Sequence, residues 1–279
     1  VWAINPFGWS SPSDASGSTT PLAAAWAFWS GGRTGASFTT NVIQRVSINS
    51  LGDTSDFGDL TYATKEAGGC SSSTRAIVAA GQGDGFNPVN IDYFSMASAG
   101  NASDFGDMSG PFDYPSGLSN STRGLIGGGG GSGGIHQNII EYITIASLGN
   151  STDFGDLINA ADTMSAAASP TRGMFFGGFA SNAAVNIIQY VTIASAGNAT
   201  DFGDLLTTLY YCGSCSNSTR ALTSGGNAGS GNTNTIQYNT IASTGNAIDF
   251  GDLVNTASAK LGNASPTRAL FGGGSGKSI

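Results

Sequence analysis

The segment GNATDFGDL, residues 197–205, decides the fold, because nearly the same residues recur four more times in the 279-residue chain. The related segments are GDTSDFGDL (52–60), GNASDFGDM (100–108), GNSTDFGDL (149–157) and GNAIDFGDL (245–253). The aspartates that open the DFGD motif follow one another at intervals of 48, 49, 48 and 48 residues. Constant periods of this length are typical of repeat architectures. One structural unit has therefore been copied along the chain.

Each repeat predicts four short β-strands. They are a small-residue stretch such as 162–169, then TRGMFFGG (171–178), NIIQYVTIAS (186–195) and ATDFGDL (199–205). Glycine-containing turns separate them, as expected for antiparallel hairpins. The third of these segments alternates between two apolar faces, whereas a sheet with one wet face would alternate apolar with polar residues. Each predicted sheet therefore needs cover on both sides.

Radial stacking of such sheets is the architecture of a β-propeller. A linear solenoid is the alternative, although its coils are usually shorter. We therefore expect residues 1–279 to form a single all-β domain, a six-bladed propeller of four-stranded blades. The blades are expected at 10–60, 61–108, 109–157, 158–205, 206–253, and 254–279 together with 1–9. In the last blade INPFGWS (4–10) would supply the outer strand and close the ring. Truncation of a longer propeller is the competing explanation.

The repeated charges predict a structural role. Ten of the sixteen aspartates belong to DFGD motifs, and five of the seven arginines follow a threonine at a matching interval. We expect the two sets to meet in charge-assisted hydrogen bonds, with the phenylalanine between blades and the glycine at positive φ. Calcium binding is an alternative, although two carboxylates fall short of the roughly 6–8 oxygens that Ca²⁺ takes. A repeated catalytic acid–base pair is a third. The residues concerned are Arg75, Arg123, Arg172, Arg220, Arg268, Asp56, Asp59, Asp104, Asp107, Asp153, Asp156, Asp201, Asp204, Asp249 and Asp252.

Composition restricts the classes of partner. The net charge is −8, and no lysine–arginine cluster is present, so we expect no nucleic-acid partner. No apolar run reaches the roughly 20 residues needed to span a bilayer, so membrane insertion is not expected. The chain has one histidine, His136, in a glycine-rich loop, and two glutamates. We therefore expect no enzymatic activity, no cofactor and no metal site.

Ligand binding is expected where the repeats differ, chiefly in the segments between the glycine pair and the third strand. The insertions SGPFDYPSG (109–117) and TTLYYCGSC (207–215) add exposed aromatic residues, which suit stacking on sugar rings beside amide and carboxylate groups. Tolerant loops without a ligand are the alternative. His136 itself is expected to be exposed to solvent. The candidate ligand-binding residues are Phe112, Asp113, Tyr114, Tyr210, Tyr211, His136 and Asn87.

Tryptophan and cysteine are unevenly placed. The four tryptophans, which fall early in the chain, would fill the ring closure or dock a neighbouring subunit. They are Trp2, Trp9, Trp26 and Trp29. Cys70, Cys212 and Cys215 are expected to be buried small residues or to form one local disulfide. The single CxxC lacks the second pair that a zinc site needs.

The repeat resembles the kelch-type propeller repeat in its arginine, its glycine pair, its third-strand tyrosine and its aromatic closing strand. This repeat differs from the kelch repeat in having phenylalanine where kelch repeats usually have tryptophan. Its arginine also lies closer in sequence to the glycine pair. Units such as STRGLIGGG (121–129) followed by NIIEYITIASLGNSTDFGDL (138–157) resemble more closely the repeats of virion and tail-fibre proteins of aquatic bacteriophages, from about Asn41 onward.

This resemblance implies a virion or extracellular protein, displayed multivalently or as a homo-oligomer. Its partner would be a host-surface glycan. The variable loops would bind this glycan without catalysing any reaction on it. One alternative is a structural protein that docks on neighbouring virion or assembly subunits. A secreted glycan-processing enzyme is a third possibility, and it would need a cluster of non-repeated carboxylates at the centre of the disc.

Overall fold

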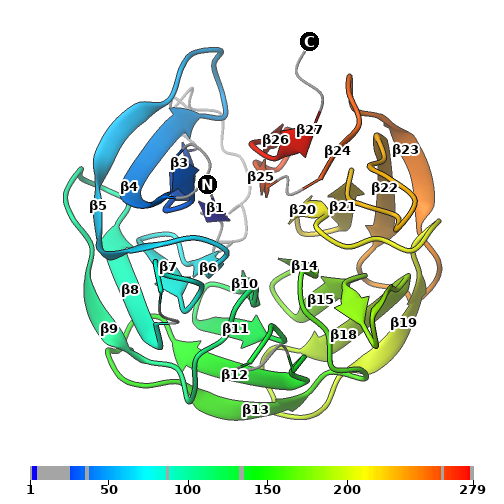
Figure 1. Cartoon of the computed structure of the whole chain (residues 1–279), viewed down its shortest axis with the longest axis horizontal. Helices are drawn as coiled ribbons and strands as arrows, with labels where there is room; N and C mark the ends of the chain where they lie inside the picture. Colours follow the sequence, from blue (N-terminus) through cyan, green and yellow to red (C-terminus); the bar gives the residue numbers. More distant parts are fainter. Residues whose placement is uncertain are drawn as a thin grey trace, which may run out of the picture.

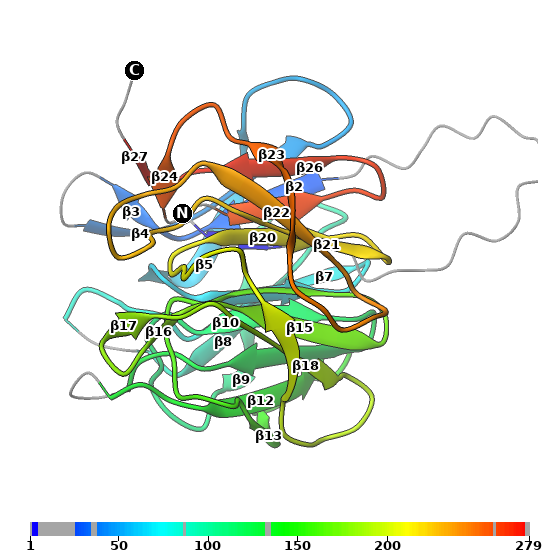
Figure 2. The ribbon, with the colours of Figure 1, turned by 90° about the vertical axis from the view of Figure 1, so that its right-hand side faces the viewer.

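A computed structural model describes residues 2–4, 26–34, 38–85, 88–131, 135–258 and 261–276 of the chain. The described residues form an all-β propeller, in which small antiparallel sheets are arranged around a central axis (Figure 1). Figure 2 shows the same molecule turned by 90°, with the elements of both chain ends on one side. These residues include no helix, so none of the described segments is a helix that could cross a membrane.

Four blades follow one plan, with the strands ordered from the axis outward as they occur in the chain. The second blade contains β6 (Gly68–Ser71), β7 (Arg75–Ala79), β8 (Asn90–Ser95) and β9 (Ser103–Asp107). The third contains β10 (Ser116–Ser119), β11 (Arg123–Gly127), β12 (Ile139–Thr144) and β13 (Thr152–Asp156). The fourth contains β14 (Ser165–Ala168), β15 (Arg172–Phe176), β18 (Ile187–Thr192) and β19 (Thr200–Asp204). The fifth contains β20 (Gly213–Ser216), β21 (Arg220–Ser224), β22 (Thr235–Thr240) and β23 (Ile248–Asp252). The predicted four strands per repeat are confirmed in these blades.

The first blade takes its innermost strand from the start of the chain. Its strands are β1 (Trp2–Ile4), β2 (Trp26–Ser30), β4 (Phe38–Ser47) and β5 (Ser55–Thr64), with the short β3 (Arg33–Thr34) beside β4. The strand β1 pairs with β2, antiparallel. The N-terminal strand therefore belongs to the first blade rather than to a sixth. The expected outer strand in 4–10 falls mostly on residues outside the described ranges.

The prediction of six blades is wrong, because the described residues form five. After the fifth blade come two pairs of short strands: β25 (Leu261–Ala264) with β26 (Ala269–Gly272), and β24 (Ala257–Ser258) with β27 (Ser275–Gly276). The β25–β26 hairpin corresponds to the first two strands of a repeat, and among the described residues β26 pairs with no strand other than β25. The strand β25 contacts β20 on one side and β1 and β2 on the other.

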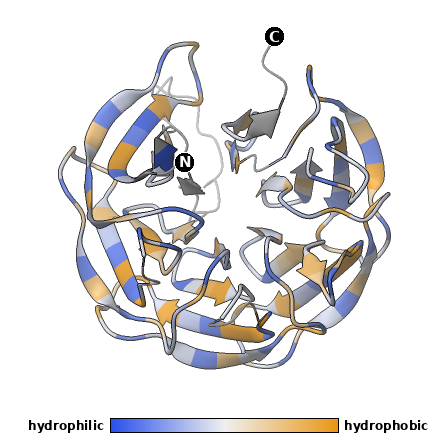
Figure 3. Ribbon diagram, in the orientation of Figure 1, coloured by the Kyte–Doolittle hydropathy of each residue, from blue (hydrophilic) through white to orange (hydrophobic). Residues whose placement is uncertain are grey.

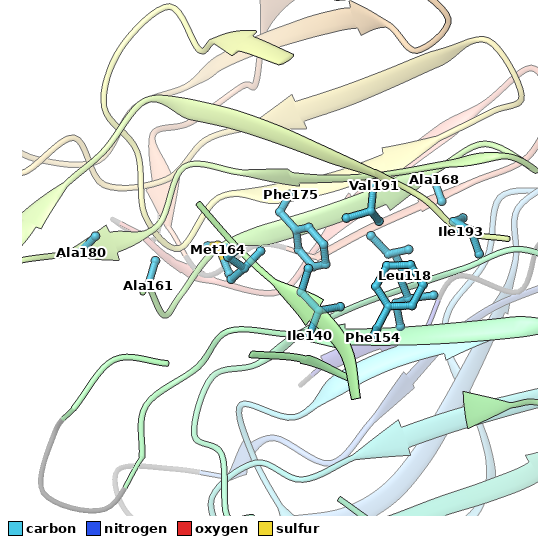
Figure 4. Packing of buried hydrophobic residues seen from close by; sticks show 12 residues of the cluster. Leu118, Ile140, Phe154, Ala161, Met164, Ala168, Phe175, Ala180, Val191 and Ile193 are labelled. Atoms are coloured by element: carbon cyan, nitrogen blue, oxygen red, sulfur yellow. The ribbon is translucent and has the colours of Figure 1, made fainter. Parts of the chain in front are cut away.

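The cores lie between neighbouring blades. In Figure 3 apolar positions recur along the strands around the disc. Between the third and fourth blades, Phe154 of DFGD is 2% exposed and belongs to one cluster with Leu118, Val191 and Ile193 (Figure 4). The phenylalanines at 57, 105 and 202 are buried in the corresponding clusters. The predicted place of this phenylalanine between blades is therefore confirmed for four repeats.

A short turn locks each of the second to fifth blades to the blade before it. The docking turn is the Gly-Asn pair and the residue after it, between the third and fourth strands. Gly197 N–H donates to Phe154 O at 2.7 Å, and Ala199 N–H donates to Asp156 O at 2.7 Å. The Asn198 side-chain oxygen accepts from Asp156 N–H at 3.0 Å. The same bonds recur where Asn101, Asn150 and Asn246 meet the preceding blade.

The glycine of DFGD is needed because the docking turn lies against it. Gly155 has φ of +144°, and a Cβ built on it would lie 2.6 Å from the carbonyl carbon and oxygen of Gly197. Gly58, Gly106 and Gly203 meet the next docking turn at similarly short distances. The positive φ predicted for this glycine is therefore present, and so is a close backbone approach that leaves no room for a side chain.

A third-strand side chain adds a further bond between blades. Gln189 Oε1 accepts from the N–H of Ile158, which follows DFGDL of the preceding blade, at 2.7 Å. Gln237 accepts from Leu206 N–H in the same way, at 2.8 Å. The corresponding residues Asp92 and Glu141 accept from Thr61 and Ser109. Because the acceptor changes from amide to carboxylate without changing the bond, these two buried acids serve the scaffold.

The repeated arginines do not pair with the repeated aspartates. Arg172 stacks over the Tyr190 ring at 4.3 Å, and its Nη1 donates to Ile241 O of the next blade at 2.6 Å. The carbonyl bond recurs from Arg75, Arg123 and Arg268, and the stack from Arg75, Arg123 and Arg220. The described residues hold ion pairs only at Arg33–Glu66 and His136–Asp162. The predicted arginine–aspartate pairing is wrong, because the guanidinium lies over its own blade's tyrosine and reaches a carbonyl group instead.

The first blade keeps this stack with its partners exchanged. Trp26 occupies the second-strand position that arginine holds elsewhere, and Arg45 occupies the third-strand position of the tyrosine. The Arg45 guanidinium lies 4.4 Å from the Trp26 ring centroid and 5.1 Å from the Phe57 ring centroid. The contact between a cation and an aromatic face is therefore preserved although both residue types have moved.

Comparison of two glycines isolates the contribution of the docking turn. Gly155→Ala and Gly251→Ala both place a side chain at φ near +140°, which costs about 1–3 kcal/mol of backbone strain. Only Gly155 faces a neighbouring backbone, whereas a Cβ on Gly251 meets nothing within 4 Å. We expect Gly155→Ala to lose roughly a further 1–3 kcal/mol of unfolding free energy through overpacking, measured by urea denaturation. Equal losses would contradict the close approach.

Comparison of two arginines isolates the carbonyl bond between blades. Arg123 has both the stack and the bond, whereas Arg220 has the stack and no carbonyl partner among the described residues. Arg220→Met should cost about 0.5–1 kcal/mol, as for an exposed cation–π contact. Arg123→Met should cost about 1.5–3 kcal/mol more, because a charged donor is lost. If the two urea midpoints fall equally, the bond contributes nothing.

Candidate functional site

One repeat position lines the mouth of the propeller axis. The residue two places before the innermost strand is Glu66, Tyr114, Thr163 or Tyr211 in four successive blades. All four have left-handed backbone, with φ of 62°, 56°, 52° and 54°. This conformation is uncommon for residues other than glycine. We call these four residues the rim.

Backbone hydrogen bonds hold the rim in place. Tyr114 N–H donates to Glu66 O at 3.1 Å, and Tyr211 N–H donates to Thr163 O at 2.9 Å. The residue before each rim residue forms a bridge to the loop that follows the second strand of its own blade, as in Asp113 with Gly130. The left-handed turn is therefore fixed from both sides and directs each rim residue toward the axis.

A small cavity lies among the rim and the innermost strands. Its volume is ≈ 80 Å³, and its walls include Tyr114, Thr163, Tyr211 and the small residues that open β6, β10, β14 and β20. A volume of this size admits a few water-sized groups and is much smaller than the roughly 300 Å³ or more of a pocket that encloses a drug-sized ligand. A ligand would therefore lie on the mouth and insert only a small polar group.

Aromatic rings run outward from the rim across the mouth. Tyr114 meets Tyr211 with ring centroids 5.5 Å apart, and Tyr211 meets Tyr210 at 5.3 Å. Tyr210 meets Phe179 at 5.2 Å, and Phe179 meets His136 at 5.9 Å. Phe179 belongs to the small hairpin of β16 (Phe179–Ala180) and β17 (Ala183–Ala184). All five rings are half-buried. We call this run the aromatic track.

Acidic groups lie beside the track. His136 Nδ1 lies 3.1 Å from Asp162 Oδ2. Gln82 Nε2 donates to Asp113 Oδ2 at 3.4 Å, and Arg33 contacts Glu66 Oε1 at 3.3 Å. Glu66 Oε2 is buried, and the Glu66 carboxyl lies beside the Tyr114 hydroxyl. The mouth therefore combines aromatic surface with hydrogen-bond acceptors.

Burial keeps the rim tyrosines neutral. The pKa of Tyr114 is raised above its ordinary value, chiefly by burial and then by the neighbouring Tyr211 and Glu66. Burial also raises the pKa of Tyr211. The pKa of the Glu66 carboxyl is raised as well, again chiefly by burial. The two hydroxyl groups thus remain donors through the physiological pH range.

The structure brings together most of the residues predicted for ligand binding. Tyr114, Tyr210, Tyr211 and His136 all belong to the aromatic track, and Asp113 adjoins the rim. The expectation that His136 is solvent-exposed is wrong, because its side chain is 19% exposed and contacts Asp162. The reason is that its loop folds back in a bridge to Gly130.

Two other candidates do not lie in the site. Phe112 is 6% exposed in the core between the second and third blades, so it cannot meet a ligand. The reason is its repeat position, because its carbonyl accepts from the Gly81 N–H of the preceding blade. Asn87 lies outside the described residues.

Sequence reasoning missed Glu66, Thr163 and Phe179. A signal for the first two was present, since they occupy the same place in the repeat as Tyr114 and Tyr211. Phe179 directly follows the glycine pair of its repeat, in a loop that varies among blades. Alignment of the repeats at the position of Tyr114 is enough to group the four rim residues.

The tryptophans that can be placed lie within the first blade. Trp29 is 8% exposed, in a cluster that Leu261 and Leu270 of the C-terminal hairpin pack against, and Trp26 is half-buried beside Arg45. Only the backbone of Trp2 is described, in β1, and Trp9 lies outside the described residues. A docking role for these residues stays a prediction.

The comparisons with known proteins assign no family to the chain. No protein-family model matches it, and no significant match is found among curated proteins. Within the described ranges, no group of three or more histidine, cysteine, aspartate or glutamate side chains gathers as metal ligands do.

The cysteines provide a test of the inner ring. All three are free and buried, so the alternative of a local disulfide is wrong. Burial raises the pKa of Cys70 and Cys215 to about 12 and that of Cys212 to about 11. Because only the thiolate reacts, we expect negligible labelling of the folded chain by a thiol reagent at pH 8. The chain unfolded without reductant should label three thiols. Rapid labelling of folded protein would contradict the buried placement.

Proposed function

We propose that this propeller is a non-enzymatic binding module that recognises a glycan at the axial mouth. The observation that carries the proposal is the aromatic track, which joins Tyr114, Tyr211, Tyr210, Phe179 and His136 in one half-buried run. Sugar rings present apolar C–H faces that pack on aromatic side chains, and hydroxyls that pair with fixed polar groups. At the axial mouth, aromatic rings and polar hydrogen-bonding groups lie side by side.

The polar groups favour a neutral, hydroxyl-rich ligand. The tyrosine hydroxyls donate, whereas Glu66, Asp113 and Asp162 supply acceptors beside the same run of rings. An anionic ligand would be repelled by these carboxylates and by the net charge of −8. The proposed ligand is therefore a neutral oligosaccharide that lies across the mouth, with one substituent directed into the small cavity.

The resemblance of the repeat to virion and tail-fibre proteins extends the proposal to biology. On this view the chain is a kelch-like viral or phage appendage, extracellular or virion-bound, and the glycan belongs to a host surface. Multivalent display would compensate for a shallow site, because linked weak sites gain avidity without new contacts.

A second candidate function is that of a structural assembly protein which docks on neighbouring subunits. A specific observation favours it, namely the apolar side chains left exposed on the fifth blade, where Phe250 is 56% and Val254 is 92% exposed. The two functions use different surfaces, so one set of variants separates them.

The test is a glycan array probed with the multivalently displayed chain. Tyr210→Ala and Tyr211→Asn each remove a ring from the track, and asparagine tolerates the left-handed backbone at 211. We expect at least about tenfold weaker binding to the recognised glycan, as for a central aromatic contact. Phe250→Ser is the matched control, because it removes an exposed aromatic ring outside the mouth.

Absence of binding by folded, multivalent protein would contradict the proposal. So would a loss in Phe250→Ser equal to that in Tyr211→Asn, because binding would then depend on the edge of the fifth blade. Circular dichroism of each variant establishes that the fold is retained.

A further inference from the structure

The cavity at the axial mouth has the size of one small substituent. Its volume is ≈ 80 Å³. A water-sized group needs about 15 Å³ on this scale, so the cavity holds on the order of five such groups. The innermost strands that line it come into backbone contact, because a Cβ on Gly117 would lie 2.4 Å from Gly69 O and one on Gly262 would lie 2.4 Å from Ser214 O. The cavity therefore admits a substituent of a few non-hydrogen atoms and excludes a whole sugar ring.

Part of the cavity wall suits an apolar group. Ala67 and Met164 line it and are 3% and 6% exposed. The serines of the wall are already hydrogen-bonded, since Ser116 Oγ donates to Met164 O and Ser214 Oγ donates to Ala166 O, both at 2.8 Å. Because these hydroxyl protons are used within the scaffold, this part of the wall favours a methyl group over a further hydroxyl group.

A chain of hydroxyl groups supplies the polar part of the wall. The Tyr114 hydroxyl is hydrogen-bonded to both Glu66 and Tyr211. A hydroxyl group has one proton and also accepts. When Tyr114 donates to the Glu66 carboxylate, it accepts from Tyr211, whose oxygen can then accept from an N–H group. In the reverse direction, which needs a protonated Glu66, Tyr211 can donate to a carbonyl oxygen. Tyr211 can thus bind either half of an amide group.

Size and charge separate the common substituents of sugars. A hydroxyl group fills only a small part of the cavity and leaves its apolar wall uncovered. A carboxylate is of suitable size but would meet the Glu66 carboxyl. An ammonium group is as small as a hydroxyl group, and its natural partner Glu66 is already in contact with Arg33 at 3.3 Å. An acetamido group consists of a nitrogen, a carbonyl carbon and oxygen, and a methyl carbon, so it has the required size and both the polar and the apolar part.

We propose that the cavity binds the acetamido group of an N-acetylated amino sugar, which makes this sugar the specificity-determining unit of the recognised glycan. The inference rests on the proposed function, because the sugar ring itself packs on the aromatic track at the rim. The methyl group lies against Ala67 and Met164, and the amide is bound by the Tyr211 hydroxyl.

The probe is a set of matched disaccharides built from glucose, galactose or mannose. Each is prepared with a hydroxyl, an acetamido or an ammonium group beside the anomeric carbon, immobilised and titrated with the intact chain. We expect the acetamido form of at least one sugar to bind at least about tenfold more tightly than its hydroxyl form. The ratio of these two affinities is called the acetamido preference.

Two variants test whether the cavity produces this preference. Tyr211→Phe keeps the ring of the track and removes the hydroxyl, so the acetamido preference should fall about fivefold, as for one lost hydrogen bond. Ala166→Val narrows the cavity and should reduce the preference to about one. Tyr210→Phe is the matched control, because it removes a tyrosine hydroxyl outside the cavity and should leave the ratio unchanged. Circular dichroism establishes that each variant is folded.

Equal binding of the hydroxyl and acetamido forms would overturn the inference and leave glycan recognition by the aromatic track intact. Tighter binding of the ammonium form would overturn it in favour of a cation site at Glu66. A preference that survives both Tyr211→Phe and Ala166→Val would place the acetamido group outside the cavity and contradict it as well. Absence of binding to any disaccharide and to any glycan of the array would contradict the proposed function together with this inference.

Discussion

The docking turn is the constraint on which the rest of the propeller depends. Its backbone lies so close to the glycine of the preceding DFGD strand that a Cβ there would approach the turn's carbonyl group to 2.2–2.6 Å. That approach brings the turn's N–H groups and asparagine oxygen to the outer strand, and it encloses the phenylalanine between blades. The glycine, asparagine and phenylalanine of the repeat therefore act together, and loss of any one would loosen the same interface.

The same interactions explain why the two ends of the ring differ from its middle. Where a third and a fourth strand follow, Phe57, Phe105, Phe154 and Phe202 are enclosed, and where they do not, Phe250 faces solvent. The C-terminal hairpin still reaches the first blade through Arg268 and Ile48. The ring thus presents variable side chains at the axial mouth and an uncovered repeat strand, with Phe250 exposed, at the edge of the fifth blade.

The repeat pattern predicts the strands because each sheet must be covered by a neighbouring blade on both faces. This requirement appears in the sequence as apolar side chains on both faces of a strand. The number of blades could not be predicted in the same way. Trp2–Ile4 carries no repeat signature, and it joins β2 through backbone pairing that any short extended segment could provide.

The prediction of arginine–aspartate pairs is wrong for a related reason. Equal spacing shows that two residues recur together, but an arginine that stacks on Tyr190 can satisfy its donors with a carbonyl group as well as with a carboxylate. In the sequence Tyr114 and Tyr211 lie in separate loops, and only the radial geometry shows that their common repeat position brings them together at the axis.

Residue-resolved hydrogen exchange of the docking turns tests the account most directly. The amides of Gly149, Gly197 and Gly245 lie in solvent-exposed turns, yet each donates to a phenylalanine carbonyl of the preceding blade. The amide of Gly52, at the same repeat position, makes no such bond among the described residues. We expect the first three amides to exchange as slowly as strand amides, and Gly52 to exchange as fast as an open loop. If all four exchange at the same rate, interblade docking does not organise this fold.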